Sequence, residues 1–174
     1  MGRFDDLVVK VETYQGLVQE NYARVRQIAE ELRGGLCDYI GASDGICVRL
    51  VPPTGPFEQK EYGDEAFSIP SKGFRTLGPI AFGLAVRVSR GTDWMRLLIS
   101  CEKIGTNFHV DIQGGKTFSL SMPVSENDPI DFYDYVYSHV SDWFQSQIDH
   151  YQRGDYGTRE IGFDFSLDSR PVEA

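Results

Sequence analysis

The alternation of apolar and polar residues between positions 80 and 122 restricts the fold more than any other feature of this chain. Turn-forming residues at 90–93, 105–106 and 114–115 divide the segment into four runs. Every second residue in each run is apolar: Phe82, Leu84, Val86 and Val88; Leu97, Ile99 and Cys101; Phe108, Val110 and Ile112; Phe118, Leu120 and Met122. A period of two puts one face of a strand on a core and the other in water. The sequence therefore predicts an antiparallel meander over residues 80–122.

Two segments with helical periodicity lie on either side of this meander. Residues 4–36 predict one long helix, and residues 128–152 predict a second. The second should begin with Asp128 as its N-cap and Pro129 at its first helical position. Its apolar stripe consists of Tyr133, Val136, Tyr137, Val140, Phe144, Ile148 and Tyr151. Because each helix carries one apolar stripe, we expect both helices to pack on the sheet.

The apolar residues of the first helix recur in alternating steps of four and three. They are Phe4, Val8, Val11, Val18, Tyr22, Val25, Ala29, Leu32 and Leu36, with Gln15 at the one polar place. Leu7, Leu17 and Ile28 widen this stripe, whereas the seam of a coiled coil is narrower. We therefore favour a helix that lies on the core, and a homodimer through the N-terminal helix is the alternative. The Gly34-Gly35 pair should end the helix.

The remaining segments complete one domain over residues 1–174. Residues 45–51 predict a strand, and 160–165 predict an edge strand before a frayed tail at 168–174. Residues 52–79 contain five prolines and four glycines, which predicts an irregular loop. Two one-sided helices and a sheet with one apolar face bury each other's apolar surface in two layers. We therefore expect a two-layer α+β fold with a mainly antiparallel sheet, formed by a meander of about four strands and one or two edge strands.

Charge, hydropathy and cysteine usage limit the class of protein further. The 174 residues carry a formal net charge of −9, which argues against nucleic acids and anionic membranes as partners. No run approaches the ~18 consecutive apolar residues of a membrane span. Cys37, Cys47 and Cys101 include no CxxC pair and no neighbouring histidine, so we expect buried thiols in a reducing cytoplasm. Phosphate-binding, dinucleotide-binding and zinc-protease motifs are missing as well, and we expect no cofactor and no metal.

The excess negative charge lies almost entirely in the last quarter of the chain. Residues 1–125 carry 14 basic and 15 acidic side chains, whereas residues 126–174 carry 3 basic and 11 acidic ones. The polar face of the second predicted helix has aspartates but no lysine or arginine. Opposite charges four residues apart stabilise a helix, and like charges destabilise it by a similar amount. A face of a single sign is therefore either plain solvated surface or a docking surface for a basic partner.

We favour a non-catalytic, acidic protein-interaction domain, by analogy of size and charge with inhibitors, immunity proteins and chaperone-like accessory proteins. The partner would be another protein with a basic surface. Aromatic side chains beside acidic ones offer such a partner a hot spot, although a broad core-facing helix carries aromatics too. The residues predicted to bind the partner are Asp131, Asp134, Tyr135, Asp142, Trp143 and Asp149.

The polar face of the meander supports an alternative, hydrolase-type function. If Ile104 pairs with Asn107, then Glu102 faces His109 and Ser100 faces Asp111. A three-residue loop at 114–116 would further place Asp111 opposite Ser119 and His109 opposite Ser121. Histidine beside a carboxylate and a hydroxyl can perform acid–base chemistry, so His109, Glu102, Asp111 and Ser119 are the catalytic candidates. However, the sequence has no nucleophile elbow of the GxSxG type.

Two further features suggest ligands rather than partners. A four-residue loop at 90–93 would set Arg87 opposite Arg96, and two opposed cations favour an anion between them. The loop at 52–79 could act as a lid over a small-molecule pocket between helix and sheet. Small-molecule binding is therefore the second alternative function.

Overall fold

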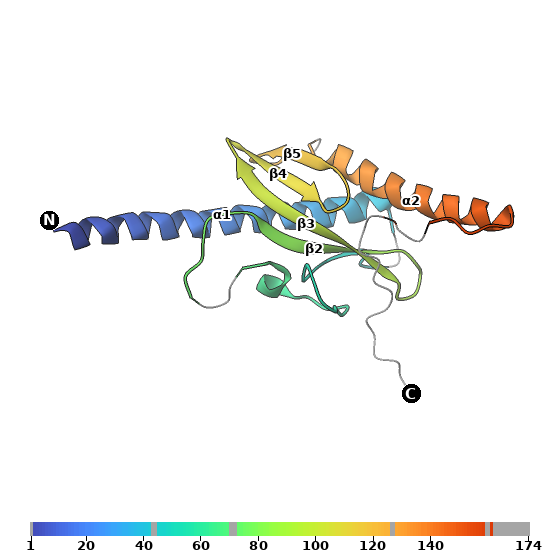
Figure 1. The fold of residues 1–174 in the computed structure, drawn as a ribbon, viewed down its shortest axis with the longest axis horizontal. Coiled ribbons are helices and arrows are strands. Elements are labelled where there is room, and N and C mark those ends of the chain that lie inside the picture. Colours follow the sequence, from blue (N-terminus) through green and yellow to red (C-terminus); the bar gives the residue numbers. More distant parts are fainter. Residues whose placement is uncertain (1, 43–44, 70–72, 126–127, 159–160, 162–174) are drawn as a thin grey trace, which may run out of the picture.

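The computed structural model of the chain describes residues 2–42, 45–69, 73–125, 128–158 and 161. The elements in chain order are α1 (Arg3–Ile40), β1 (Val48–Val51), η1 (Gly63–Ala66), β2 (Ile80–Arg87), β3 (Trp94–Ile104), β4 (Asn107–Ile112), β5 (Thr117–Ser121) and α2 (Ile130–Gln152). The strands form one antiparallel sheet in the order β1-β2-β3-β4-β5, with α1 running behind it (Figure 1). This arrangement confirms the predicted α+β fold in two layers.

The core lies between the alternating apolar face of the sheet and the inner sides of the two helices. Its sheet residues include Phe82, Leu84, Leu97, Ile99, Phe108, Val110, Ile112 and Leu120, all fully buried. The second half of α1 contributes Val25, Ile28, Ala29, Leu32 and Leu36, and α2 contributes Phe132, Tyr133 and Val136. Burying each large aliphatic side chain stabilises the fold by about 1.5–3 kcal/mol, so this layer contact holds the domain together.

The predicted strand at 160–165 lies outside the described residues except for Ile161. Ile161 is buried against the core, but no strand is assigned to it. The tail predicted at 168–174 lies outside the described residues altogether.

The register of the central hairpin matches the prediction, and the registers of its two neighbours differ from it. Ile104 pairs with Asn107, and Glu102 pairs with His109. The loops after β2 and β4 each begin one residue earlier than predicted, at 89–92 and 113–115. The backbone N–H of Val88 therefore donates to the oxygen of Asp93 at 2.9 Å. Because each shift changes the facing partner by two residues, every side chain keeps its predicted face.

Side-chain hydrogen bonding explains the earlier start of the first loop. The hydroxyl oxygen of Ser89 accepts the backbone N–H groups of Gly91 and Asp93 at 3.1 and 3.2 Å. Serine at the first position of a turn commonly forms such bonds to the next turn residues. The apolar periodicity of the strands gives no information about these hydrogen bonds within the turn.

Helix α1 continues past Gly34-Gly35 to Ile40, so the predicted end of the helix was wrong. It ends instead at Gly41, which has a left-handed φ of 75°. A Cβ on Gly35 would lie 1.8 Å from the hydroxyl oxygen of Tyr133 on α2. That hydroxyl donates to the carbonyl oxygen of Glu31 at 3.2 Å. Gly35 is therefore a packing position at the α1–α2 crossing rather than a stop signal.

Only the second half of α1 lies on the sheet. Its buried residues begin at Val18, whereas Phe4 and Leu7 are exposed, and in Figure 1 the N-terminal part of the helix extends beyond the sheet. The prediction that the whole stripe faces the core is thus confirmed for residues 18–36 and wrong for the first turns. A homodimer through these turns stays a prediction, which light scattering at two protein concentrations tests.

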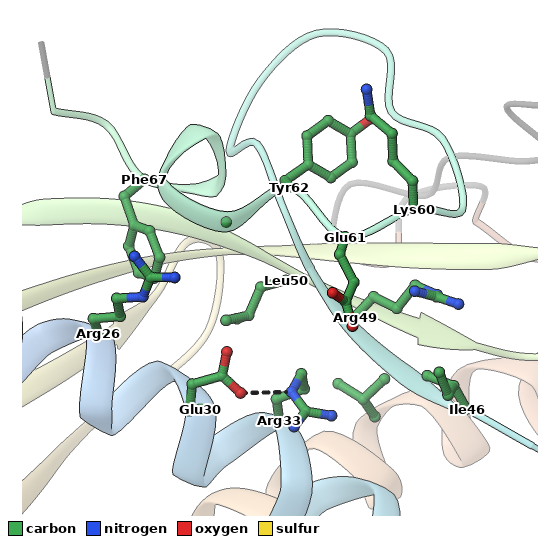
Figure 2. Close-up of a pocket in the computed structure, with 12 residues that line it drawn as sticks. Arg26, Glu30, Arg33, Ile46, Arg49, Leu50, Lys60, Glu61, Tyr62 and Phe67 are labelled. Atoms are coloured by element: carbon green, nitrogen blue, oxygen red, sulfur yellow. Dashed lines mark hydrogen bonds and ion pairs between the residues drawn. The ribbon is translucent and has the colours of Figure 1, made fainter. Parts of the chain in front are cut away.

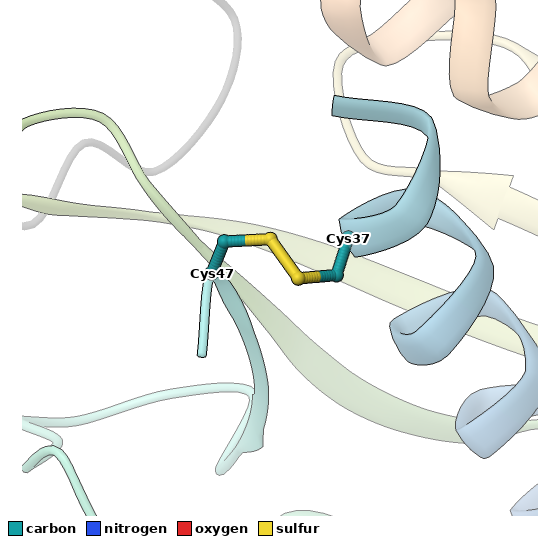
Figure 3. Close-up of a disulfide and its surroundings, with 2 residues drawn as sticks. All are labelled: Cys37 and Cys47. Atoms are coloured by element: carbon teal, nitrogen blue, oxygen red, sulfur yellow. A yellow bond between two sulfur atoms is a disulfide. The ribbon is translucent and has the colours of Figure 1, made fainter. Parts of the chain in front are cut away.

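A disulfide joins Cys37 to Cys47, contrary to the predicted pair of buried thiols (Figure 3). Cys37 lies in the last turn of α1, and Cys47 directly precedes β1. Their Cα atoms are 5.5 Å apart, within the usual range for a disulfide. The prediction ended the helix too early and so placed Cys37 in a connecting loop. Structural disulfides are typical of oxidising compartments, so the cysteines no longer support a cytoplasmic location.

Helix α2 begins at Ile130, two residues after the predicted N-cap. The side chain of Asp128 instead accepts a hydrogen bond from the Ser121 hydroxyl at 2.8 Å, which links the helix start to the end of β5. Hydrogen bonds from Ser121 and Ser125 to this carboxylate lower the pKa of Asp128. Pro129 takes the N-cap position, and its carbonyl oxygen accepts the N–H of Tyr133 at 3.0 Å.

Candidate functional site

Helix α2 packs on the core through its N-terminal half. Phe132 and Val136 are buried, and Val140 and Trp143 are partly buried against the same core. Beyond this point the helix extends past the sheet, on the side opposite to the free end of α1 (Figure 1). The predicted apolar stripe of α2 therefore meets the core over part of its length only.

The chain after α2 turns back and covers one side of the helix. The backbone N–H of Asp155 donates to the carbonyl oxygen of His150 at 2.9 Å. The side-chain amide of Gln147 donates to the carbonyl oxygen of Thr158 at 2.7 Å. The ring of His139 is hydrogen-bonded to the carbonyl oxygen of Ile161. This return segment lies against one side of the helix, and Tyr39 of α1 meets Asp134 and Tyr137 on another side near the helix start.

Four aspartates, which we call the acidic strip, lie on the side of α2 away from the return segment: Asp131, Asp134, Asp142 and Asp149. All four are exposed. Tyr39 donates to Asp134 at 2.9 Å, and Gln145 donates to Asp149 at 3.0 Å, so these two carboxylates have neutral donors. Asp134 raises the pKa of Tyr39 through this hydrogen bond. In the described part of the chain, no lysine or arginine forms an ion pair with any member of the strip.

A second row of residues, which we call the apolar strip, follows another side of α2, separated from Asp142 and Asp149 by Ser138, Gln145 and Gln152: Tyr137, Phe144, Ile148 and Tyr151. Tyr137, Ile148 and Tyr151 are 52%, 49% and 69% exposed, and Phe144 is half-buried. These residues were predicted to face the core, which is wrong for the three exposed ones because the sheet ends before it reaches them. The ring of Tyr39 contacts that of Tyr137, with 6.3 Å between the centroids, and extends the strip onto α1.

Tyr135 and Trp143, the two aromatics predicted to bind the partner, pack largely into the protein itself. The Tyr135 ring lies 5.6 Å from that of Phe118, and the ammonium group of Lys116 lies 5.4 Å from its centroid. Trp143 is partly buried against the core. The exposed aromatic surface of α2 therefore comes mainly from the apolar strip. The spacing of three and four residues identified the members of this strip, but the sequence analysis expected them to face the core.

The catalytic candidates share the outer face of the sheet. His109 faces Glu102 on β3 as predicted, and it faces Ser119 on β5 in place of Ser121. Asp111 pairs with Thr117, whose hydroxyl donates to it at 2.7 Å, and not with Ser119. Among the hydrogen bonds of the described residues, none joins His109 to Glu102 or to Ser119. The structure thus gathers these side chains on one face, and their catalytic role stays a prediction.

The predicted Arg87–Arg96 pair does not form. Arg87 faces Trp94, and Arg96 faces Ala85, because the loop starts one residue early. Arg96 is only 6% exposed. Its guanidinium donates to the carbonyl oxygens of Pro52 and Gly55 at 3.1 and 2.6 Å and lies 5.1 Å from the centroid of the Phe57 ring.

These contacts make Arg96 the anchor that holds the proline-rich loop on the sheet. We expect Arg96→Ala to lower the free energy of unfolding by about 2 kcal/mol, since two charge-assisted hydrogen bonds and a packed side chain are lost. Chemical denaturation measures this loss. Arg24→Ala, which removes an exposed ion pair with Glu20, is the control and should cost about 0.5 kcal/mol or less. Equal effects of the two substitutions would contradict the anchoring role.

A pocket of about 210 Å³ lies between α1, the edge strand β1 and the proline-rich loop (Figure 2). Its cations, Arg26, Arg33, Arg49 and Lys60, are accompanied by Glu30 and Glu61. The guanidinium of Arg33 pairs with Glu30 at 2.9 Å.

Other charges near this pocket also neutralise one another. Arg26 and Tyr22 both donate to Asp64 on η1, and the bond from Tyr22 is the main cause that lowers the pKa of Asp64. These bonds tie η1 to α1. This pocket is smaller than the ~300–1,000 Å³ of most ligand sites, and small-molecule binding beneath the loop stays a prediction.

Comparison of the chain with protein-family models, with curated proteins and with solved structures returned no match. None of the helices in the described residues combines the length and apolarity that crossing a bilayer requires. Within the same residues, no group of three or more histidine, cysteine or acidic side chains could hold a metal ion.

Proposed function

We propose that this protein is a non-catalytic interaction domain that binds a basic partner protein through the acidic strip of α2. The observation that carries the proposal is the exposure of all four aspartates together with the lack of ion pairs to them among the described residues. Some acids elsewhere on the surface have basic partners. Glu20 pairs with Arg24, and Glu30 pairs with Arg33.

Electrostatics explains how such a strip would act on a partner. Aspartates of one sign along a helix repel each other weakly, and a basic partner relieves this repulsion while it gains attraction of its own. A single-sign strip also speeds the encounter with an oppositely charged surface. Exposed charges are screened over about 8–10 Å at physiological salt, so the attraction should weaken as salt rises.

The other two function classes have less support from the geometry. The polar sheet face holds His109 without a hydrogen bond to its neighbouring acid among the described residues, and the pocket beneath the loop is small. The acidic strip supports the proposal because it gathers four exposed carboxylates of one sign, with no ion pair to them among the described residues.

The proposal predicts that reversing two charges of the strip weakens partner binding. Asp142→Lys combined with Asp149→Lys should raise the dissociation constant at least about tenfold at low salt, because two favourable charge pairs become repulsive. The measurement compares the binding of a partner purified on the wild-type protein, by calorimetry, at two salt concentrations.

The matched control makes the same change of net charge elsewhere. Glu58→Lys combined with Glu65→Lys alters two exposed acids between β1 and β2, far from α2 in sequence, and we expect less than a twofold effect. If both double variants weaken binding equally, only the net charge matters, and the assignment to α2 is wrong.

A further inference from the structure

We propose that the pocket between α1, β1 and the proline-rich loop binds a phosphate group through Arg49 and Lys60. The ligand is inorganic phosphate or a small phosphate monoester. The observation that carries this inference is the Nε atom of Arg49, which is buried and has no acceptor among the described residues, on a side chain that lines the pocket. The site is separate from the acidic strip, so the inference does not depend on the proposed function.

The guanidinium of Arg49 is the central donor of the pocket. Arg49 lies on β1, the edge strand of the sheet, between the wall that α1 forms and the wall that the loop forms (Figure 2). No hydrogen bond or ion pair joins its side chain to another described residue. A buried N–H group without an acceptor is unfavourable, and nearly all such groups in folded proteins have one. A ligand with acceptor oxygens would satisfy this group.

Two of the four cations that line the pocket are already neutralised. The guanidinium of Arg33 pairs with Glu30 at 2.9 Å, and that of Arg26 pairs with Asp64 on η1. These two pairs fix the side chains on the α1 side of the pocket. They leave the charge balance of the site to the side chains on β1 and on the loop.

The remaining lining charges sum to a net positive value. Lys60 is exposed, and its ammonium group lies 4.8 Å from the centroid of the Tyr62 ring. Within the described part of the chain it forms no ion pair. Glu61 is the remaining acid of the lining, and its single charge does not balance those of Arg49 and Lys60. An anion in this pocket would therefore be attracted by an excess of positive charge.

The chemistry of these donors favours phosphate over other anions. A guanidinium donates two parallel N–H groups to an oxyanion, and a lysine ammonium binds phosphate as a point charge. A phosphate monoester carries about −1.5 to −2 charge at pH 7, which matches two cations better than the single charge of a carboxylate does. The volume of about 210 Å³ suits a group of this size rather than a drug-sized ligand.

The Cys37–Cys47 disulfide holds the walls of the pocket together (Figure 3). Cys37 follows Arg33 on α1 by one turn, and Cys47 precedes Arg49 by two residues. The bond thus links the α1 side of the site to the strand that carries its central donor. Groups held in place before the ligand arrives lose less conformational entropy on binding.

NMR titration of the full-length protein tests this inference. The readout is the side-chain Nε–H signal of Arg49, which is assigned by its loss in the variant Arg49→Gln. The probes are inorganic phosphate, phenyl phosphate and acetate, each compared with chloride at equal ionic strength. The backbone signals of each variant show whether its fold is intact.

Three variants separate a phosphate site from a general effect of charge. We expect Arg49→Gln to weaken phosphate binding at least about tenfold, because the bidentate donor is lost. The matched control Arg24→Gln makes the same charge change on α1 outside the pocket lining and should change the affinity less than about twofold. Glu61→Gln, an exposed position on the loop, should strengthen binding about twofold or more, because a repulsive charge is removed.

Tighter binding of phenyl phosphate than of inorganic phosphate would support a monoester as the ligand, and the reverse order would support the free ion. Equal responses of the Arg49 signal to phosphate and to chloride would overturn the inference, since only screening would then act. Acetate that binds as tightly as phosphate would overturn the choice of phosphate. Equal weakening by Arg49→Gln and Arg24→Gln, or no gain in Glu61→Gln, would contradict the location of the site.

Discussion

Gly35→Ala should lower the free energy of unfolding by about 3 kcal/mol, whereas Gly34→Ala, one residue earlier, should raise it by about 0.5–1 kcal/mol. The two glycines lie in the same helix, and neither has a left-handed φ. A Cβ at position 34 meets nothing within 4 Å, so alanine there only favours the helical backbone. A Cβ at position 35 would lie 1.8 Å from the hydroxyl oxygen and 2.4 Å from the ring carbon Cζ of the buried Tyr133.

The cost at position 35 has two physical parts. Overpacking of a tight contact costs about 1–3 kcal/mol, and the displaced tyrosine also loses its hydrogen bond to Glu31, worth about 1 kcal/mol. Denaturant unfolding of the two single variants measures the difference directly. Equal effects of the two alanines would show that α2 does not cross α1 at Gly35.

Loss of the Cys37–Cys47 disulfide should lower the free energy of unfolding by about 3 kcal/mol. The bond closes a short segment, with a sequence separation of 10, that links the end of α1 to the edge strand β1. Closing a loop of this length in the unfolded chain removes about 3 kcal/mol of conformational entropy at 25 °C in the chain-entropy model. Unfolding of the oxidised and reduced proteins in denaturant, with the Cys37→Ala/Cys47→Ala double variant as a third sample, gives the value.

Thiol counting provides an independent check on this disulfide. Burial raises the pKa of the Cys101 thiol to about 12, so this thiol should resist alkylation while the protein is folded. After unfolding without reductant, one thiol per chain should react, and after reduction three should react. Three reactive thiols without reductant would contradict the disulfide.

The alternating apolar residues were sufficient to predict the sheet. Successive side chains of a strand point to opposite faces, so a strand with one buried face must be apolar at every second residue. Side chains at Phe82, Leu84 and Val86 had to face one way, and even the shifted loops preserved that face. The exact positions of the hairpin loops were not predictable in this way. They depend on bonds such as those that the Ser89 hydroxyl accepts from Gly91 and Asp93, which belong to the turn and not to the strand.

For the helices, the residue pattern predicted neither where α1 ends nor which turns lie on the core. Gly34-Gly35 has the composition of a helix end, but only the position of Tyr133, 98 residues later in the sequence, shows why one glycine is needed inside the helix. The stripes of α1 and α2 likewise do not indicate how far the sheet beneath them extends. Phe4 at one end and Tyr151 at the other were assigned to a core that stops before it reaches them.

The candidate site was predictable in its charge and not in its apolar part. Asp131, Asp134, Asp142 and Asp149 follow from the composition of the last quarter, and all four are exposed as their polar face required. Tyr137, Ile148 and Tyr151 were hidden within a stripe that also contains buried residues. Their exposure depends on where α2 leaves the sheet, which is a property of the tertiary structure.

The role of α2 as the binding surface can be tested by amide hydrogen–deuterium exchange on the protein alone and with the partner isolated on it. Our account predicts slower exchange on binding within residues 141–152, with little change in β3–β5 or in the loop at 52–79. Protection confined to the strands around His109, or to the loop above the pocket, with α2 unchanged, would contradict it.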